Sequence, residues 1–143
     1  MSWSRKILEL DHNFAPAHYG LAGAYKGKGL YREAIYEYQE SIKFGGDSPS
    51  DQIYLGAVYA QAGELKTAQQ ILRRLETSKD YVSPGELAVL YTSLGERDQA
   101  FASLEKAYAA HDLQLQYLGA DSSFDSLRED AHFKDLMHRI GLP

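Results

Sequence analysis

The amino-acid sequence predicts an all-α fold of paired helices with a helical cap at its C-terminal end. The first observation is a Tyr-x3-Gly-x4-Ala motif that occurs three times, at Tyr25, Gly29 and Ala34, at Tyr59, Gly63 and Ala68, and at Tyr91, Gly95 and Ala100. The second is the spacing between the motif tyrosines, which is 34 residues and then 32. The third is a leucine four residues before each tyrosine, namely Leu21, Leu55 and Leu87. Repetition at this period is typical of stacked helical repeats.

The first helix of each repeat is expected to lie before the motif glycine. Leu21 and Tyr25 are four residues apart, a spacing that places two side chains on one face of a helix. The glycine that follows is expected to end this helix. The backbone must turn there with a positive φ, which glycine adopts without steric cost.

The first of these turns also has another interpretation. The stretch "YKGKGLYREAI" (25–35) places Lys28 between two glycines before a helix, and some proteins hold phosphate in such a loop. Only the second glycine recurs in the other motifs, because Gln61 and Ser93 stand in place of Gly27. The preceding residues have a helical period, whereas a phosphate loop follows a strand. A turn is therefore predicted, not a nucleotide site.

The second helix of each repeat is expected to follow the glycine. Its apolar positions are Ala34, Ile35 and Tyr38, then Ala68, Leu72 and Leu75, then Ala100, Leu104 and Ala107. The small alanines are expected where two helices cross closely, because a larger side chain would force the helices apart.

The starts of the first helices carry capping residues. The stretches "SPSD" (48–51) and "SPGE" (83–86) each offer a serine N-cap, a proline at the first helical position and an acid at the third. Pro16 marks the start of the first repeat in the same way.

Composition narrows the class of protein. The 143 residues carry a net charge of −5, which disfavours a nucleic-acid partner, and they contain no cysteine. No stretch approaches the length of apolar sequence that spans a membrane, and the N-terminus lacks the apolar middle of a signal peptide. We therefore expect a soluble, cytoplasmic protein with no nucleic-acid and no membrane partner.

Candidate chemistry is sparse in the sequence. The histidines lack metal-ligand spacing; they are His12, His18, His111, His132 and His138. The acidic cluster of Asp121, Asp125, Glu129 and Asp130 lacks the spacing of a calcium loop. Asp125 and Asp130 are interpreted as acids at helix N-termini, where the helix dipole favours them. The sequence therefore predicts no catalytic residue, no metal and no cofactor, and an enzyme is the least favoured class.

The three motifs together resemble the tetratricopeptide repeat (TPR). The leucine, tyrosine and alanine positions of that family are filled in all three units, and its glycine position holds Ala22, Gly56 and Ala88. The sequence departs from the family pattern where tryptophan is common, at His18, Gln52 and Pro84, and where proline is common, at Gly46, Asp80 and Asp112. The resemblance implies an α-α superhelix, a right-handed solenoid of helix pairs.

The resemblance also divides the chain. We expect a partial repeat or capping helix at 1–14, repeats at 15–48, 49–80 and 81–111, and a capping segment at 112–143. The first segment resembles the second helix of a repeat cut from a longer array, and a lone capping helix is the alternative. Trp3, Ile7 and Leu8 in it suit a partner helix, so we expect weak self-association through this end.

The last segment breaks the repeat period. It reads as a short apolar helix, an acidic loop with Phe124 and Leu127, and a last helix near 131–140. It resembles the tail that closes TPR regions in bacterial regulatory proteins. Its apolar side chains are expected to pack on the helix that carries Phe101, Leu104 and Tyr108.

The resemblance implies a concave groove lined by the first helices, and hence a non-catalytic module that binds a peptide or a partner helix. The implied groove positions are Tyr19, Gly23, Lys26, Ile53, Tyr54, Ala57, Gln61, Glu86, Val89 and Ser93. Gly20 and Gly23 are expected to leave room for a ligand beside Tyr19. The alternative is a structural or oligomerisation segment of a larger bacterial regulatory protein.

Overall fold

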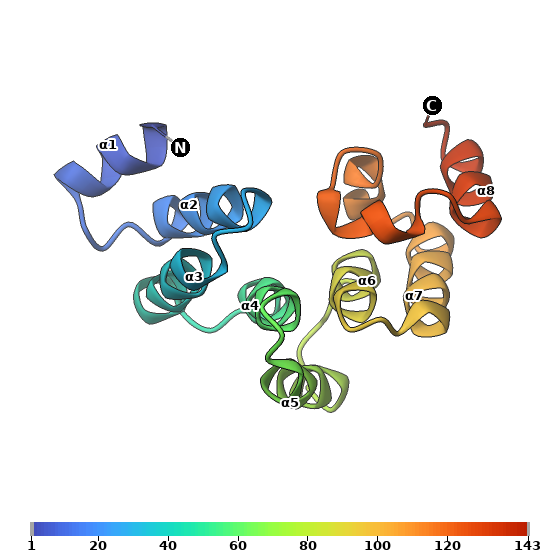
Figure 1. The fold of residues 1–143 in the computed structure, drawn as a ribbon, viewed down its shortest axis with the longest axis horizontal. Helices are drawn as coiled ribbons and strands as arrows, with labels where there is room; N and C mark the ends of the chain where they lie inside the picture. The colour runs from blue at the N-terminus through green and yellow to red at the C-terminus, as the bar shows by residue number, and fades with distance from the viewer. Residues whose placement is uncertain (1, 143) are drawn as a thin grey trace. The chain divides into compact units, whose positions relative to one another are not determined.

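The computed structural model describes residues 2–142, which are helical with no strand among them (Figure 1). The all-α prediction is confirmed, while Met1 and Pro143, at the ends of the first and last predicted segments, lie outside the described residues. The α-helices are α1 (Ser2–Leu10), α2 (Ala15–Gly27), α3 (Tyr31–Gly45), α4 (Pro49–Gln61), α5 (Leu65–Glu76), α6 (Pro84–Ser93), α7 (Arg97–Ala109) and α8 (Ala131–Arg139). Two short 3₁₀-helices, η1 (Leu113–Tyr117) and η2 (Ser122–Leu127), lie between α7 and α8.

The chain divides into two compact units between Ser78 and Lys79. The first unit holds α1 to α5, and the second holds α6 to α8 with η1 and η2.

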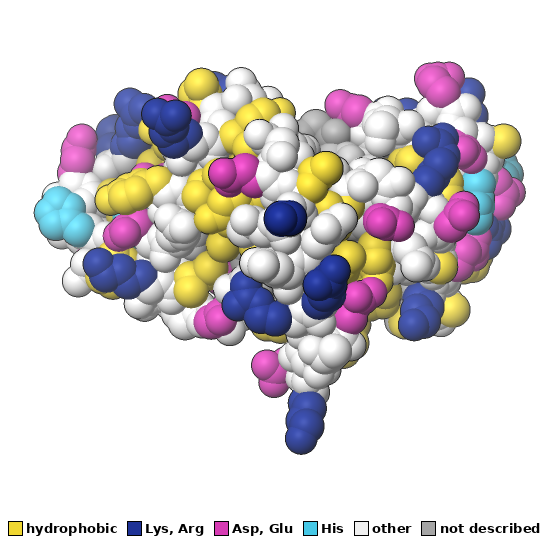
Figure 2. All heavy atoms as spheres, turned by 60° about the horizontal axis from the view of Figure 1, so that its bottom comes forward, with side chains coloured by type: hydrophobic (Ala, Val, Ile, Leu, Met, Phe, Trp, Pro, Cys, Tyr) yellow, Lys and Arg dark blue, Asp and Glu magenta, His cyan; other side chains and the backbone are white. Residues whose placement is uncertain are grey.

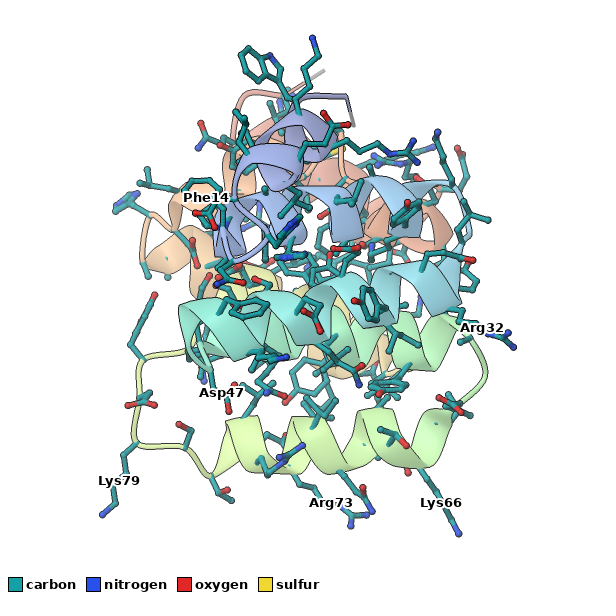
Figure 3. All side chains as sticks on the ribbon, turned by 90° about the vertical axis from the view of Figure 1, so that its left-hand side faces the viewer. Phe14, Arg32, Asp47, Lys66, Arg73 and Lys79 are labelled. Carbon is teal, nitrogen blue, oxygen red and sulfur yellow. The ribbon has the colours of Figure 1, made fainter. Side chains whose placement is uncertain are left out.

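Helices that follow one another in the chain pack as pairs. In the first unit α2 packs on α3 and α4 packs on α5, and in the second unit α6 packs on α7 (Figure 1). The motif alanines Ala34, Ala68 and Ala100 have no exposed surface, as predicted for a close helix crossing. The outer side of α5 is polar, and Lys66 and Arg73 point away from α4 there (Figure 3).

The motif glycines end the first helix of each pair, as predicted. Gly29, Gly63 and Gly95 have φ values of 76°, 90° and 77°. In each case the N–H of the residue after the glycine donates to the carbonyl of the motif tyrosine, at 2.8 to 2.9 Å. This bond is the signature of a Schellman turn, which joins the third residue before the C-cap to the second residue after it. The Tyr-x3-Gly spacing is therefore the spacing of the turn itself.

The two predicted serine caps are also confirmed, whereas α2 begins one residue before Pro16, after Phe14, and has no side-chain cap. The Ser48 hydroxyl accepts from the Asp51 N–H and the Ser83 hydroxyl from the Glu86 N–H, both at 3.2 Å. Asp130 caps α8 by accepting from the His132 N–H at 2.8 Å. Each bond satisfies an N–H that the helix itself leaves without a partner.

The C-terminal segment is packed, not extended. Its buried apolar side chains are Leu115, Leu118, Phe124, Leu127, Phe133 and Leu136. On α7, the predicted partner, Phe101 stacks on His132 with ring centroids 4.3 Å apart, and Arg139 lies over the ring of Tyr108 at 5.0 Å. η1 packs on α6 as well as on α7, whereas η2, which carries Phe124 and Leu127, packs on α6, a contact that the sequence did not predict. The predicted acidic loop is largely the 3₁₀-helix η2, in whose first turn Asp125 pairs with Arg128 at 2.7 Å.

Candidate functional site

The implied groove positions lie on three helices. In the first unit α2 carries Tyr19, Gly23 and Lys26, and α4 carries Ile53, Tyr54, Ala57 and Gln61; in the second unit α6 carries Glu86, Val89 and Ser93.

The structure brings two of these positions together around a buried ring. The ring centroid of Tyr19 lies 5.7 Å from that of Tyr38 and 6.1 Å from that of Tyr54, both in edge-on contacts. Tyr38 and Tyr54 stack at 6.4 Å. Tyr38 is 2% exposed, whereas Tyr19 and Tyr54 are half-buried. We call these three residues the tyrosine cluster. The half-buried rings of Tyr19 and Tyr54 form its accessible surface, and both pack on the buried ring of Tyr38.

Several other groove positions offer little or no surface in this structure. Ile53 and Ala57 have no exposed area, Val89 is 1% exposed and Lys26 is 9% exposed. Gly23 and Gln61 are exposed, and Glu86 and Ser93 are half-buried. Among the groove positions of the first unit, a ligand can therefore reach Tyr19, Gly23, Tyr54 and Gln61.

The two glycines beside Tyr19 have different surroundings. A Cβ on Gly20 would come 3.1 Å from the Ser4 hydroxyl, so this glycine faces α1 and not the space beside Tyr19. The interpretation of Gly20 as room for a ligand is therefore wrong, because the position is small to admit α1. A Cβ on Gly23 would meet only the Tyr38 hydroxyl, at 4.0 Å, which leaves open space above the tyrosine cluster.

A cavity of about 480 Å³ opens next to Tyr19. Its walls come from the start of α2, the end of α3 and the start of α4, and its polar groups are Ser41, Ser48 and Asp51. Sequence reasoning missed this cavity. Its only local signal, the "SPSD" stretch, indicated a helix cap and nothing more.

A buried histidine is a second feature that the sequence did not reveal. His18 Nδ1 lies 2.6 Å from a carboxylate oxygen of Glu37, and His18 Nε2 lies 2.7 Å from the carbonyl oxygen of His12. Both partner atoms accept hydrogen bonds, so both ring nitrogens donate, which only the imidazolium form can do. Burial lowers the pKa of His18, but the hydrogen bonds to Glu37 and His12 outweigh it, and the pKa lies above its ordinary value.

The second unit has a cavity of its own, of about 580 Å³, between the end of α7, η1 and the end of α8. Among its wall residues are Asp112 and Arg139, and Arg139 already pairs with Glu105 and with Asp135. The hydrogen bond from Arg139, followed by that from His132, lowers the pKa of Glu105 to about 2. The cation beside this cavity is therefore neutralised within the protein.

On the surface, basic and acidic side chains are intermingled on the face drawn in Figure 2. Within residues 2–142, no group of three histidine, aspartate or glutamate side chains is arranged to hold a metal ion. In the same range, no helix is both long and apolar enough to cross a membrane.

Comparison with known proteins gives no match, either to a protein-family model or to a curated protein.

Proposed function

We propose that the three helix pairs are tetratricopeptide repeats and that the chain is a non-catalytic protein-binding module. The support is the equivalence of the motif positions in all three pairs. In each pair the tyrosine carbonyl accepts the bond of the Schellman turn, the glycine has a positive φ, and the alanine is fully buried.

The proposed site is the tyrosine cluster of the first unit, where a peptide or a partner helix lies across Tyr19 and Tyr54. The observation that carries this proposal is the pair of half-buried rings fixed against buried Tyr38. Rigid aromatic side chains provide a large contact area and lose little rotamer entropy on binding, and tyrosine is enriched at binding hot spots. Because Gly23 has no side chain, the surface beside the tyrosine cluster is left uncovered at this position.

A second candidate function is self-assembly within a larger regulatory protein. The observation that favours it is the apolar surface of α1, where Trp3 is 77% exposed and Leu10 is 91% exposed. Trp3, Ile7 and Leu10 follow one face of the helix at spacings of four and three residues. Exposed apolar surface of this kind marks contact sites.

The test of the binding function is a selection of peptides from a displayed random library on the full chain. The affinity of a selected peptide is then measured by fluorescence anisotropy for the parent and for variants. Gly23→Gln is the decisive variant because its Cβ would stand in ordinary contact, 4.0 Å from the Tyr38 hydroxyl of the tyrosine cluster, and glutamine is the better helix former by about 0.5–1 kcal/mol.

Gly23→Gln and Tyr54→Ala are each expected to weaken binding by about tenfold or more. Tyr36→Ala is the matched control, since Tyr36 is a 57% exposed tyrosine on α3. Tyr54 also packs on two rings, so circular dichroism must show that its variant is folded. Failure to select any peptide, or binding that is indifferent to Gly23→Gln, would reject the proposed site.

A further inference from the structure

The cavity beside Tyr19 holds a buried carboxylate that lacks a cation. Asp51 is 8% exposed and accepts hydrogen bonds from the Ser41 hydroxyl at 3.0 Å and the Ser48 hydroxyl at 2.8 Å. Across residues 2–142, no lysine, arginine or histidine forms an ion pair with it. A buried charge without an opposite charge is costly, even where hydrogen bonds satisfy part of its need.

The carboxylate keeps the capacity to bind a further donor. Each of its oxygens accepts one hydroxyl hydrogen bond, and each carboxylate oxygen has lone pairs for about two. The two serines fix the carboxylate in place at the wall of the cavity. An ammonium or guanidinium group entering the cavity would supply an opposite charge and a further donor to oxygens that already accept one hydrogen bond each.

The rest of the cavity suits the stem of a long basic side chain. Tyr19 and Pro16 supply an aromatic and an apolar wall on α2. Lysine and arginine lay their methylene chains along apolar surface while the charged end reaches a polar group, and an aromatic face attracts a cation that passes over it. A Cβ on Gly45 would stand 2.6 Å from the Cβ of Ala15, so the end of α3 and the start of α2 meet closely at this cavity.

We propose that this cavity is a subsite for a lysine or arginine side chain of a bound peptide, with its charged end at Asp51 and its stem along Tyr19. The inference rests on the proposed peptide-binding function, since the cavity adjoins the tyrosine cluster through Tyr19. The chain's net charge of −5 adds a general attraction for a basic ligand.

The experiment uses small probes, so that it does not depend on knowing the partner. Backbone amide shifts of the full chain are followed by NMR during titration with N-acetyl-lysine methylamide, its arginine counterpart, and its norleucine counterpart. Norleucine keeps the alkyl chain but lacks the ammonium group. The basic probes are expected to shift the amides of Tyr19, Ser41 and Asp51 in a saturable way, and norleucine is expected to leave them unchanged.

Variants then locate the charge that attracts the probe. Asp51→Asn is expected to weaken lysine binding by about tenfold, because a charged hydrogen bond is lost. Asp47→Asn is the matched control, because Asp47 is an exposed carboxylate in the connection between α3 and α4, four residues before Asp51 (Figure 3). If Asp51→Asn unfolds, salt titration of the parent replaces it, and lysine binding must weaken as salt rises.

The outcomes separate this inference from the proposed function. Equal shifts with norleucine, equal affinities for the two asparagine variants, no salt dependence, or no saturable shift would each overturn the basic subsite. A library-selected peptide that lacks basic residues, yet loses binding in Gly23→Gln, would overturn the subsite and leave the proposed function standing. Specific binding of the lysine probe, with no peptide selected from the library, would overturn the proposed peptide-binding function and leave the lysine site at Asp51 standing.

Discussion

At the scale of single residues, the side chain of His18 links α2 to the segment that precedes this helix and to the helix that follows it. It joins Glu37 on α3 to the His12 carbonyl in the connection before α2, and Phe44 stacks on it with ring centroids 5.9 Å apart. Its side chain is 9% exposed in the ion pair, so solvent screens the pair only weakly. This contact is expected to make the stability of the first unit depend on pH.

The direction of that dependence follows from the raised pKa of His18. Because the folded pKa lies above the unfolded one, the contribution is complete below about pH 6.5 and is lost as the pH rises through the folded pKa. Glu37→Gln is expected to cost about 1.5–3 kcal/mol of unfolding free energy below pH 6 and less at alkaline pH, because it removes a charged hydrogen bond.

Urea unfolding at both pH values measures this difference, with His138→Gln as an exposed-histidine control. If Glu37→Gln lowers the unfolding free energy equally at both pH values, His18 does not carry its charge in the folded protein.

At the scale of helices, Asp112 joins the starts of two elements in the second unit. Its carboxylate accepts from the Ser83 hydroxyl at 2.7 Å and the Gly85 N–H at 3.1 Å, at the start of α6. It also accepts from the Gln114 N–H at 2.9 Å, at the start of η1. Gly85 must be small here, since a Cβ would lie 2.9 Å from the Cβ of Gln114.

Asp112→Asn is expected to lower the unfolding free energy by about 1–3 kcal/mol at neutral pH, because an amide cannot accept at both of its ends. Burial raises the pKa of Asp112, but the hydrogen bonds from Gln114, Ser83 and Gly85 lower it further, so the folded pKa lies below the ordinary value. The contribution is therefore present above about pH 4 and is lost as the pH falls through the folded pKa.

Denaturant melts across the acidic range test this, with exposed Asp98→Asn as the control. If Asp112→Asn lowers the unfolding free energy no more than Asp98→Asn does at neutral pH, the hydrogen bonds of Asp112 to α6 and η1 contribute nothing to stability.

The same elements show what sequence can predict. The turns and caps were predictable because their donors and acceptors lie within five residues of each other, as in the bond from Leu30 to Tyr25. The buried alanines followed from their place in a repeated pattern. The pair of His18 and Glu37 and the cavity around Asp51 were not predictable, because their groups come from different helices. Periodicity shows which face of a helix is apolar, but it does not show which polar groups of two helices meet.

At the scale of the whole molecule, we expect the exposed apolar side chains of α1 to form contacts between copies of the chain. Trp3 and Leu10 together are expected to drive weak self-association at high concentration, because burying a large apolar side chain contributes about 1.5–3 kcal/mol. Light scattering should show a mass above that of the monomer for the parent, and the monomer mass for Trp3→Ser with Leu10→Ser.

Tyr81→Ser is the control, since Tyr81 is 77% exposed in the second unit. The same mass for parent and double variant at every concentration would remove α1 as a contact surface.

The pairing of consecutive helices has a kinetic consequence. Each pair joins helices that neighbour one another along the chain, so little loop entropy is lost when they meet, and helical proteins rich in such local contacts fold within microseconds to milliseconds. The bond between Glu105 and Arg139 instead closes a span of 34 residues. We therefore expect α6 and α7 to associate early, with arrival of the C-terminal segment as the slower step that completes the second unit.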